Sequence, residues 1–596
     1  MAEYMALSLI LAAAIYLFWT HRLPYELTAT LVLLALILPW PHADGEWKAI
    51  LTYEEAFSGF GSSAVIMITA MFIFGGALVQ TGAAEWVGAR LFRAAAVKEW
   101  LLQLTVLTMT TLCSMFVNDT TTVLVFMPLI LTVCRERDIS PSRYLLFAAY
   151  GSLLGGQWTL IGTRSNILIS DFHRQYTGQS LGFFDFTPMA AGIFLASALY
   201  LVTVGRRLLP TSAQSVKAGG EEDREYLAEV VVTESSPSVG KRVEELGWSK
   251  RSDMSVVEVL RGDQRIPRWF RLEPGDVLIM EGPPQTIREL LKTTDFQLKE
   301  EVKIDPKTLQ SVNLVTVEAL LAPSSRYQGR TLDQVDFNRF YRFTIMGISR
   351  YGETIRSRMS EIPLQFGDYL LLLGNVGDLP RLRSNRNLIL LGEKSVPAIG
   401  RRKAVMTILL LLGIILTAVT GVLSPPVSIP LAAVLAILFG CINLQDAYGN
   451  IDWPTIITLG GMIPLGLALE KTGAAADLAR LLVSTFDGLP PIFLLGAILL
   501  LAVVLTQLIE NAAVAIILAP LAYQVAVGSG VDPKPFMVGL AVCVSSAFCT
   551  PVAHESTILV LGPGGYRFRH YLQLGSVLAL TTWLLGTVLT PMIWPF

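Results

Sequence analysis

Apolar residues gather into long runs at both ends of this chain, and polar residues fill the stretch between them. Runs such as 5–19, 27–40, 406–422, 492–508 and 571–589 are long enough, or nearly so, to cross about 30 Å of hydrocarbon as helices. We expect roughly eleven such spans, with shorter apolar pieces forming re-entrant hairpins. The pattern predicts a polytopic α-helical membrane protein with one membrane half at 1–209 and a second at 403–596.

The polar stretch, about 215–395, alternates short apolar and polar segments and is itself duplicated. Gly240 returns as Gly329 with an offset of 89, and Gly275-Asp276 returns as Gly367-Asp368 with an offset of 92. A Gly-Asp pair suits a tight turn between strands, because glycine tolerates positive φ and aspartate bonds nearby backbone. Two small α/β domains are therefore expected at 221–300 and 305–393, with strands at 229–233 and 315–321.

The two membrane halves also repeat one another, at an offset of 391 or 392. Thr81-Gly82 returns as Thr472-Gly473, and Pro128 returns as Pro520. Repeated apolar halves, each interrupted by polar and Gly/Pro-containing segments, are typical of secondary transporters built from inverted repeats. The interruptions are then the expected place of the binding site.

Composition agrees with a membrane protein. Of 596 residues, 52% are hydrophobic and 16% charged, with a mean hydropathy of +0.53. Arg206-Arg207 closes the first half and Arg401-Arg402-Lys403 opens the second, so the positive-inside rule predicts that 210–402 is cytoplasmic in a plasma (inner) membrane. The five cysteines and five histidines show no metal, disulfide or triad spacing. An enzyme and a resident cofactor are not expected.

The first candidate element is a polar stretch at the start of an apolar segment in each half. Asn118-Asp119-Thr120 leads toward Pro128, and Glu510-Asn511-Ala512 leads toward Pro520. Such groups are costly in lipid unless they face a cavity or a partner, and a hairpin tip can aim half-helix ends at ions. The structural alternative is an ordinary helix N-cap, and both can hold together.

The second candidate element is a Gly- or Pro-containing polar segment. In the first half it is 159–166 and contains Gly162, Thr163, Arg164, Ser165 and Asn166; in the second it is 550–557 and contains Thr550, Ala553, Glu555, Ser556 and Thr557. Unwinding would free carbonyls to coordinate Na⁺. The alternative is a kinked helix whose hydroxyls bond back to their own turn.

Arg164 aligns with Glu555 and has two interpretations. Its planar fork of donors could bind a sulfate or carboxylate, or it could neutralise Glu555 or Asp119. With Glu510, these residues give the expected cavity a formal charge of −2. Anion entry would then require compensating cations, which favours coupling to Na⁺ or H⁺.

The tips and broken segments resemble those of the divalent anion/sodium symporter family of the ion transporter superfamily. The polar insert resembles tandem TrkA-C (RCK-C) modules, which points to the branch that carries them. Asp119, Glu510, Ala512, Glu555 and Thr557 depart from the family's usual residues. The resemblance implies a homodimer with two Na⁺ sites at the hairpin tips, one dianion site, and a possible small, nucleotide-like regulatory ligand at the modules.

The expected sites follow from the motifs and the resemblance together. Substrate-binding residues are expected at Asn118, Asp119, Thr120, Arg164, Ser165, Asn166, Asn511, Ala512, Ser556 and Thr557. Residues for Na⁺ or H⁺ are expected at Asn118, Asp119, Gly162, Thr163, Glu510, Asn511, Thr550, Ala553 and Glu555.

The expected function is symport of a small inorganic dianion, sulfate first, with the tips moving against a scaffold in elevator-type alternating access. The preference for sulfate comes from the branch, not from a residue. A Na⁺/H⁺ or other cation exchanger, a dicarboxylate symporter and a ligand-gated channel are the alternatives, the last disfavoured by the absence of a filter-like motif. The lipid bilayer is the expected environment, and nucleic acid is not an expected partner.

Overall fold

The computed structural model covers most of both membrane halves and part of the polar stretch. It describes residues 2–20, 22–41, 47–82, 92, 98–137, 139–209, 226–234, 236–246, 255–261, 264–266, 270–282, 296–298, 314–321, 325–335, 337, 341–350, 362–365, 368–375, 378–379, 382, 387–391, 401–485, 488–551 and 553–596. Gly367, predicted in a Gly-Asp turn, lies outside this set.

The first half consists of helices, several of which end at short connections. They are α1 (Ala2–Thr20), α2 (Tyr25–Ile37), α3 (Tyr53–Phe57), η1 (Ser58–Gly61), α4 (Ser63–Gln80), α6 (Glu99–Ser114), α7 (Asp119–Arg137), η2 (Pro141–Arg143), α8 (Leu145–Gly156), α9 (Arg164–Thr177), α10 (Thr187–Tyr200), the π-helical η3 (Leu201–Gly205) and α11 (Arg206–Leu208). A two-stranded ribbon, β1 (Trp40–Pro41) and β2 (Trp47–Lys48), follows α2.

The second half repeats the order of the first. Its helices are α19 (Arg401–Thr420), α20 (Pro425–Leu438), α21 (Leu444–Asn450), α22 (Trp453–Lys471), α23 (Ala474–Thr485), α24 (Pro491–Leu505), α25 (Asn511–Gly528), α26 (Pro533–Val544), α27 (Glu555–Leu561) and α28 (Phe568–Ile593). At the offset found in the sequence, α4 corresponds to α22, the α6–α7 pair to the α24–α25 pair, and α8 and α9 to α26 and α27.

Fewer helices are long enough to cross a membrane than the roughly eleven spans expected from apolar run length. Among the described residues six helices qualify by length and composition, within 53–80, 187–208, 402–420, 453–471, 511–528 and 568–593, and six more apolar helices are shorter. The count falls because polar turns end several of the runs early. For example, the run 492–508 becomes α24, which stops at Leu505 before the turn that leads into α25.

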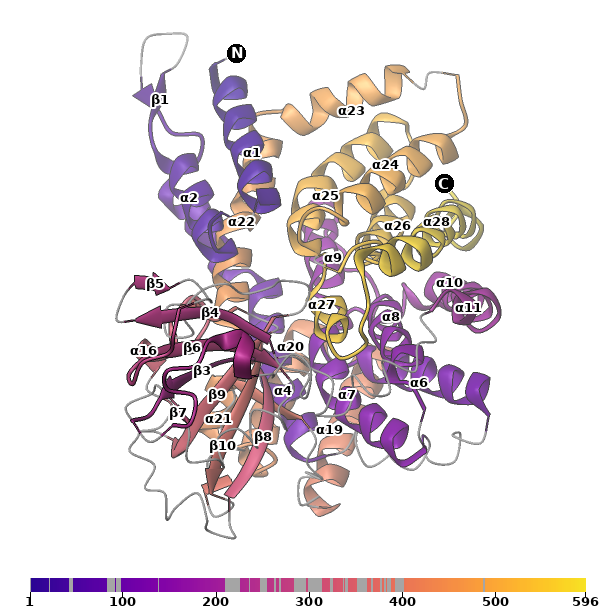
Figure 1. Cartoon of the computed structure of the whole chain (residues 1–596). Coiled ribbons are helices and arrows are strands. Elements are labelled where there is room, and N and C mark those ends of the chain that lie inside the picture. The colour runs from indigo at the N-terminus through magenta and orange to yellow at the C-terminus, as the bar shows by residue number, and fades with distance from the viewer. Residues whose placement is uncertain are drawn as a thin grey trace.

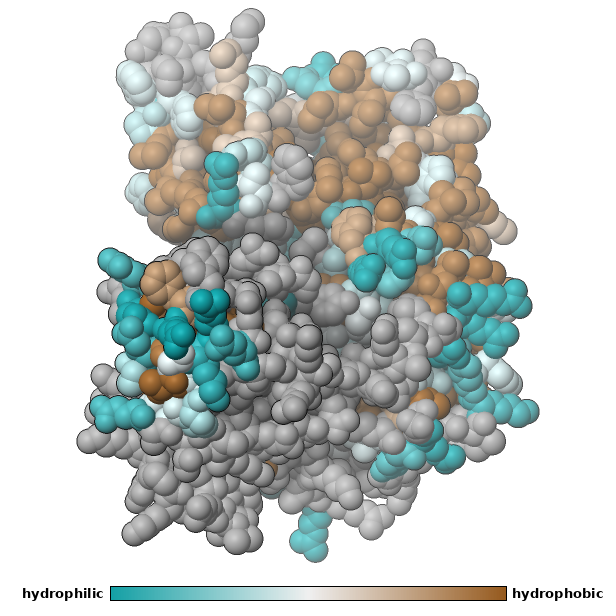
Figure 2. Space-filling model, in the orientation of Figure 1, coloured by the Kyte–Doolittle hydropathy of each residue, from teal (hydrophilic) through white to brown (hydrophobic). Residues whose placement is uncertain are grey.

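Each half packs a helix against the other half. α2 lies along α22, and α20 lies along α4, which is the same pairing with the halves exchanged. Likewise α9 contacts α25, and α7 contacts α27. In Figure 1 the N-terminus lies at the top, the C-terminus on the right below α23, and the strands of the polar stretch at the lower left. In Figure 2 hydrophobic residues gather over the helices on the upper right and hydrophilic ones over the strands. The halves are therefore one interlocked body.

Close packing of α6 on α8 depends on small residues. A methyl group on Gly151 would lie 2.7 Å from the Leu107 carbonyl oxygen, and one on Gly155 would lie 2.8 Å from the Ser114 Cβ. Thr111 Oγ1 donates to the Gly151 carbonyl at 2.9 Å. Small residues that allow such backbone approach are typical of helix pairs in membranes. This contact holds the C-terminal end of α6, and with it the following turn, against α8.

The polar stretch forms antiparallel strands in two groups. The first group is β3 (Tyr226–Val232), β4 (Ser255–Arg261), β5 (Gln264–Ile266), β6 (Val277–Gly282) and β7 (Phe296–Leu298); the second is β8 (Leu314–Leu321), β9 (Phe343–Ser349), β10 (Tyr369–Asn375) and β11 (Leu388–Leu391). A short helical turn follows the first strand of each group, η4 (Val243–Leu246) and α16 (Leu332–Val335). The strands predicted at 229–233 and 315–321 are confirmed as β3 and β8.

The two groups share one sheet, because β3 and β9 also pair with each other. The strand order is β11-β8-β10-β9-β3-β6-β4-β5, with β7 beside β3. The joint is a single register pair, Leu227 with Ile348. The strand groups lie within 221–300 and 305–393, where two small domains are expected, and they meet edge to edge.

A buried aspartate closes the same turn in each group. Asp276 accepts two hydrogen bonds from Arg261, from Nε at 2.8 Å and from Nη2 at 2.9 Å. Asp368 accepts the corresponding two from Arg350, at 2.7 and 2.8 Å. The hydrogen bond that Arg261 donates to Asp276 raises the pKa of the Arg261 guanidinium. Gly275 has a φ of +90°, which confirms the positive φ predicted for its turn.

The groups turn opposite faces toward the membrane helices. Along β10, Tyr369, Leu371 and Leu373 belong to the same apolar cluster as the membrane core, whereas Leu370 and Leu372 belong to a separate cluster within the sheet. In β6 the alternation is reversed, since Leu278 and Met280 join the membrane cluster and Val277 joins the other. Tyr369 therefore has no counterpart at the repeat position, where Val277 points the other way.

Candidate functional site

The two polar tips are short turns that a hydroxyl closes in the same way. In the first, Ser114 Oγ at the end of α6 donates to Asp119 Oδ1 at the start of α7, at 2.6 Å. In the second, Thr506 Oγ1 after α24 donates to Asn511 Oδ1 at the start of α25, at 2.5 Å. Donor and acceptor each recur with an offset of 392. Both tips therefore hold the first residue of the second helix in a fixed, buried position.

The residues before these helices occupy cap positions. Asn118 Oδ1 accepts from the backbone N–H of Thr120 at 2.9 Å, which is N-cap geometry. Glu510 takes the N-cap position of α25 but its side chain makes no capping hydrogen bond. The carboxylate of Glu510 is thus available for another partner.

The first broken segment lies between Gly156, where α8 ends, and Arg164, where α9 begins. Asn166 Nδ2 donates to the carbonyl oxygens of Gly156 at 3.0 Å and Thr159 at 2.8 Å. Gly162 lies against Gly156, because a methyl group on Gly162 would approach the Gly156 Cα to 3.0 Å. Thr163 is extended and takes the N-cap position of α9. The segment is non-helical, with its turn held by one amide.

The second broken segment lies between Val544, where α26 ends, and Glu555, where α27 begins. Thr557, at the position equivalent to Asn166, bonds other carbonyls: its Oγ1 lies 3.0 Å from the Pro551 oxygen and 2.7 Å from that of His554, in its own turn. The backbone N–H of Ala553 donates to Thr550 Oγ1 at 3.1 Å. A hydroxyl here replaces the amide of the first half.

Each tip is tied to the broken segment of its own half by a threonine. Thr159 Oγ1 donates to the carbonyl of Met115 at 2.5 Å, and Thr550 Oγ1 donates to that of Gln507 at 3.4 Å. These are repeat-equivalent bonds. Tip and break therefore form one unit in each half.

Each tip also meets the broken segment of the opposite half. Thr120 Oγ1 donates to Glu555 Oε2 at 2.9 Å, and His554 Nε2 lies 3.5 Å from Asp119 Oδ2. In the reverse direction, Arg164 Nη2 lies 3.6 Å from Glu510 Oε1. We call the polar tips tip one (118–120) and tip two (510–512), and the broken segments break one (159–166) and break two (550–557). Tip one thus contacts break two, and tip two contacts break one. The structure brings all four polar elements to one place.

Arg164 has partners that neither sequence interpretation named. Its ion pair is with Glu510 rather than with Glu555 or Asp119, and its Nη1 donates to Thr455 Oγ1 at 2.6 Å. Thr455 in turn donates to Asp452 Oδ2 at 2.5 Å. Repeat alignment set Arg164 against Glu555, but equivalent positions need not touch, and Glu555 is held by Thr120 instead.

The remaining predicted residues lie in the same region. Ser165 Oγ is 3.2 Å from Ser545 Oγ, and Ser556 bonds the His554 ring through both its hydroxyl and its backbone N–H. That N–H can only donate, so His554 Nδ1 accepts. When the imidazole is neutral its proton is therefore on Nε2, toward Asp119. Ala512 is buried and offers no polar side-chain atom.

Two buried amides at the site keep an atom without a hydrogen-bond partner among the described residues: Asn511 Nδ2, a donor, and Asn166 Oδ1, an acceptor. A buried polar atom without a partner is destabilising unless a ligand or water completes it. The donor suits an anion and the acceptor suits a cation.

The charges around the site are unbalanced. Asp119, Glu510 and Glu555 are carboxylates, Arg164 is the guanidinium among them, and His554 is close by. Arg164 and Glu510 keep only 15% and 20% of their side-chain surface exposed. Buried charge of one sign requires compensation by a bound ion, a proton or a partner.

Comparison with known families gives a match over nearly the whole chain. A family model described as a citrate transporter matches residues 15–563. The chain belongs to the citrate transporter family. It is accordingly an integral membrane protein of the divalent anion:Na⁺ symporter superfamily that transports anions, and not an enzyme, as the sequence predicted.

Relatives of this citrate transporter family member carry several names. An uncharacterised transporter of Synechocystis is 30% identical, over 98% of this chain and 95% of its own length. Sodium/sulfate cotransporter 2 of Chlamydomonas reinhardtii is 25% identical, over 61% of this chain and 42% of its own. Among solved structures, the YdaH transporter of Alcanivorax borkumensis matches with a TM-score of 0.42 and 13% identity, covering 97% of this chain and 98% of that one.

Several polar residues at the site of this family member escaped the sequence analysis. Ser114 and Thr506 close the tips, and Asp452 and Thr455 reach the site from α22. Ser114 and Thr506 obey the same offset as the tips and could have been found by extending the alignment a few residues upstream. Thr455 has a repeat counterpart in Ser63, but no pattern in the repeat places Asp452 or Thr455 beside Arg164, because that depends on how α22 packs across the halves.

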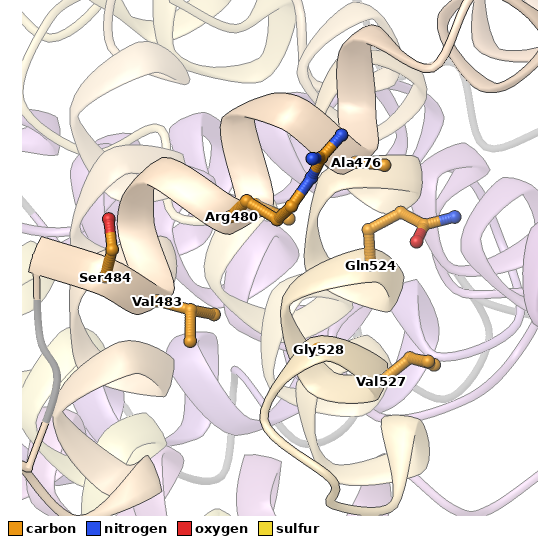
Figure 3. Close-up of a pocket in the computed structure, with 8 residues that line it drawn as sticks. Ala476, Arg480, Val483, Ser484, Gln524, Val527 and Gly528 are labelled. Atoms are coloured by element: carbon orange, nitrogen blue, oxygen red, sulfur yellow. The ribbon is translucent and has the colours of Figure 1, made fainter.

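A separate cavity of about 510 Å³ lies away from these residues, between α23 and α25. In Figure 3 Arg480 extends along α23 while Gln524, on α25, faces it across the hollow. Arg480 forms an ion pair with Asp477 of its own helix. None of the predicted site residues lines this cavity, so it is not the candidate transport site of the family member.

Proposed function

We propose that this chain is a secondary active symporter of a small dianion, with sulfate as the first candidate, driven by Na⁺ or H⁺. The observation that carries the proposal is the reciprocal crossing of tips and breaks. Thr120 reaches Glu555 and Glu510 reaches Arg164, so both halves contribute to one site. A site shared by two repeats is what alternating access requires, because movement of the repeats can open it to either side.

Substrate recognition is assigned to the donors of the site. The Arg164 guanidinium offers several N–H donors, and Asn511 Nδ2 is a buried donor without a partner among the described residues. With Ser165, Ser556 and the helix starts at Asn511 and Glu555, they could surround an oxyanion. Sulfate is supported by the name of the sodium/sulfate cotransporter relative, and a carboxylate by the citrate transporter family, so a dicarboxylate is the second substrate candidate.

Coupling is assigned to the acceptors. Asp119, Glu510 and Glu555 are negatively charged, and they would repel an anion that entered the site without a cation. The oxygens of Asn118, Thr550 and the broken backbone segments are suited to Na⁺, the suspected ion at each tip. Protonation of a carboxylate would serve the same balance. A Na⁺/H⁺ or other cation exchanger is the alternative function that this excess of carboxylates favours.

Movement is proposed to follow an elevator scheme with inverted repeats. The bonds between tips and broken segments lie within α6–α9 and α24–α27, while α2 with α22 and α20 with α4 form the cross-packed pairs of a scaffold. Arg164 also bonds Thr455 of α22. The first group would move as a body relative to the second, in a homodimer embedded in the bilayer of the plasma (inner) membrane.

The sheet is proposed to be a tandem TrkA-C (RCK-C) module on the cytoplasmic side, with a small, nucleotide-like regulatory ligand. Its support is the duplicated strand–turn–helix–strand order and the duplicated Arg–Asp turns. A direct contact offers a route for regulation. A methyl group on Gly562, directly after α27, would lie 2.5 Å from the Tyr369 hydroxyl oxygen and 2.9 Å from its Cε2, so the ring of β10 rests on this glycine.

The experiment is uptake of labelled sulfate into proteoliposomes that contain the purified chain, with an inward Na⁺ gradient, an inward H⁺ gradient, or neither. Gradient-dependent, saturable uptake is expected, and unlabelled dicarboxylates added outside will report whether they compete. Proton movement driven by Na⁺, without flux of any anion, would replace the proposal by the exchanger.

A further inference from the structure

Helix α9 is tied at both of its ends to the first turns of two helices that belong to the cross-packed pairs. At its start, Arg164 Nη1 donates to Thr455 Oγ1 of α22, at 2.6 Å. In its last two turns, Asp171 Oδ1 accepts from Ser63 Oγ of α4, at 2.7 Å, and Arg174 Nη2 donates to the same hydroxyl at 2.9 Å. Under the repeat offset of 391, Ser63 and Thr455 fall one position apart.

The hydrogen bonds at the two ends of α9 differ in whether they involve a residue of the candidate site. Asp171 and Arg174 pair with each other, at 2.9 Å, and lie two and three turns along α9 from Arg164. Arg164 belongs to the first broken segment and faces Glu510 of tip two, where its guanidinium lies among three carboxylates. The bond from Arg164 to Thr455 therefore occupies an N–H group that would otherwise be available to a ligand in the site.

The partner of Arg164 is itself set by a charge. The Thr455 hydroxyl has one hydrogen, which it donates to Asp452 Oδ2 at 2.5 Å, so its oxygen is left to accept from Arg164. Asp452 precedes α22 at the N-cap position without making a side-chain capping bond. The chain Asp452–Thr455–Arg164 is thus oriented in one direction and presents an acceptor to Nη1.

We propose that the hydrogen-bond chain Asp452–Thr455–Arg164 is a latch, which holds α9 against α22 when no anion is bound. Thr455 and Asp452 are then positioning residues for transport. The inference rests on the proposed function, in that the anion must bind to Arg164. A dianion offers Nη1 a charged acceptor, and charged acceptors form stronger hydrogen bonds than a neutral hydroxyl. Nη1 has two N–H groups, but the guanidinium is planar and rigid, so an anion that draws it toward the tips turns the N–H bonded to Thr455 out of line. Anion binding therefore releases α9 from α22, and an empty site restores the bond.

The kinetic consequence separates two modes of transport. In exchange, the carrier crosses the membrane loaded in both directions and the latch stays open. In net uptake, the carrier must return empty and has to break the Arg164–Thr455 bond each time. Exchange is expected to be faster than net uptake by about tenfold, since one hydrogen bond to a charged group is of that magnitude.

The test compares both modes in proteoliposomes with labelled sulfate and equal Na⁺ on both sides: net uptake into empty vesicles, and exchange into vesicles preloaded with unlabelled sulfate. Thr455→Val keeps the shape of the side chain and removes the acceptor. It is expected to speed net uptake until the two rates are nearly equal. Asp452→Asn, which weakens the orientation of Thr455, is expected to change the ratio in the same direction and serves if the first variant does not fold.

Thr472→Val is the matched control, the same substitution at the other end of α22, where the hydroxyl bonds Ala468 of its own helix at 2.8 Å. It should leave the ratio of exchange to net uptake as in the unmodified chain. Equal rates in the unmodified chain, or a ratio that Thr455→Val leaves unchanged, would overturn the latch while the proposed function stands. Absence of labelled sulfate flux in both modes would overturn the proposed function, and the latch with it.

Discussion

Thr120 donates its hydroxyl hydrogen to the carboxylate of Glu555 at 2.9 Å and so joins the start of α7 to the start of α27. The two residues are 435 positions apart, one in each half of the chain. The bond makes the site a property of both halves. It also suggests the first of several measurements.

Removal of the Thr120–Glu555 bond should weaken coupling. Thr120→Val leaves the Glu555 carboxylate without its donor, and Glu555→Gln keeps a group that can accept the bond but removes the charge. Both are expected to raise the Na⁺ concentration for half-maximal uptake, by about tenfold for the lost hydrogen bond, or to shift the pH dependence if H⁺ is the coupling ion. Thr132→Val, on the same helix with its hydroxyl bonded to the Pro128 carbonyl, is the control. Unchanged ion dependence in Glu555→Gln would assign this residue to structure.

Arg164 should be needed as an arginine. Arg164→Ala is expected to abolish anion uptake, because it removes the guanidinium and leaves Glu510 without its ion-pair partner. Arg164→Lys keeps the charge but lacks the planar fork, and should raise the KM for anion more than it lowers kcat. The measurement is the concentration dependence of initial uptake. Near-normal anion affinity in Arg164→Ala would remove Arg164 from the substrate site.

Gly156 should be intolerant of a side chain although it ends a helix that alanine would favour. A methyl group there would lie 2.8 Å from Asp119 Oδ1 and displace this carboxylate from its bond with Ser114. Gly156→Ala is expected to lower uptake about tenfold or more, the usual scale of overpacking a tight site. Gly413→Ala in α19, where a methyl group meets nothing within 4 Å, should transport normally. Equal uptake by the two variants would contradict the role of this close approach.

Arg350 should matter for the stability of the sheet. Arg350→Ala leaves the fully buried Asp368 without its two side-chain donors, and removal of one partner of a buried pair costs about 3–5 kcal/mol. Faster hydrogen exchange of the β9 and β10 amides is expected in the purified full chain. Arg326→Ala, at an exposed position of the same strand group, should leave exchange unchanged.

The contact between Tyr369 and Gly562 should restrain transport if the sheet regulates it. Cysteines at both positions, in a background with the five native cysteines replaced, are expected to be joined by a short bifunctional thiol reagent, and this crosslink should block uptake. Tyr369→Ala should instead alter the rate of uptake and leave the KM for anion as it was. Full uptake by the crosslinked double-cysteine variant would mean that α27 and β10 keep their contact throughout the cycle.

The sequence predicted those parts of the site that repeat. Asn118 to Thr120, Glu510 to Ala512 and the two broken segments were found because polar residues recur there at a constant offset inside apolar sequence. Partners across the halves were not predictable in the same way. Whether Arg164 meets Glu555 or Glu510 depends on how two tips and two breaks cross in space, which an alignment of the halves does not contain.

The pairing of β3 with β9, which joins the two strand groups, could not be predicted from the sequence either. Turn residues and alternating strands predicted β3 and β8, because these are local patterns. The pairing of β3 with β9 is one register pair between strands more than a hundred positions apart. No local pattern encodes such a contact.

That joint has a consequence for any attempt to separate the two strand groups. A cut between β7 and β8 would remove the Leu227–Ile348 pair and expose backbone groups of β9 and of the part of β3 that β7 does not cover, and such unpaired groups recruit other chains. Each fragment should therefore self-associate or precipitate when produced by itself, whereas the pair produced together should be soluble and should unfold in a single cooperative transition.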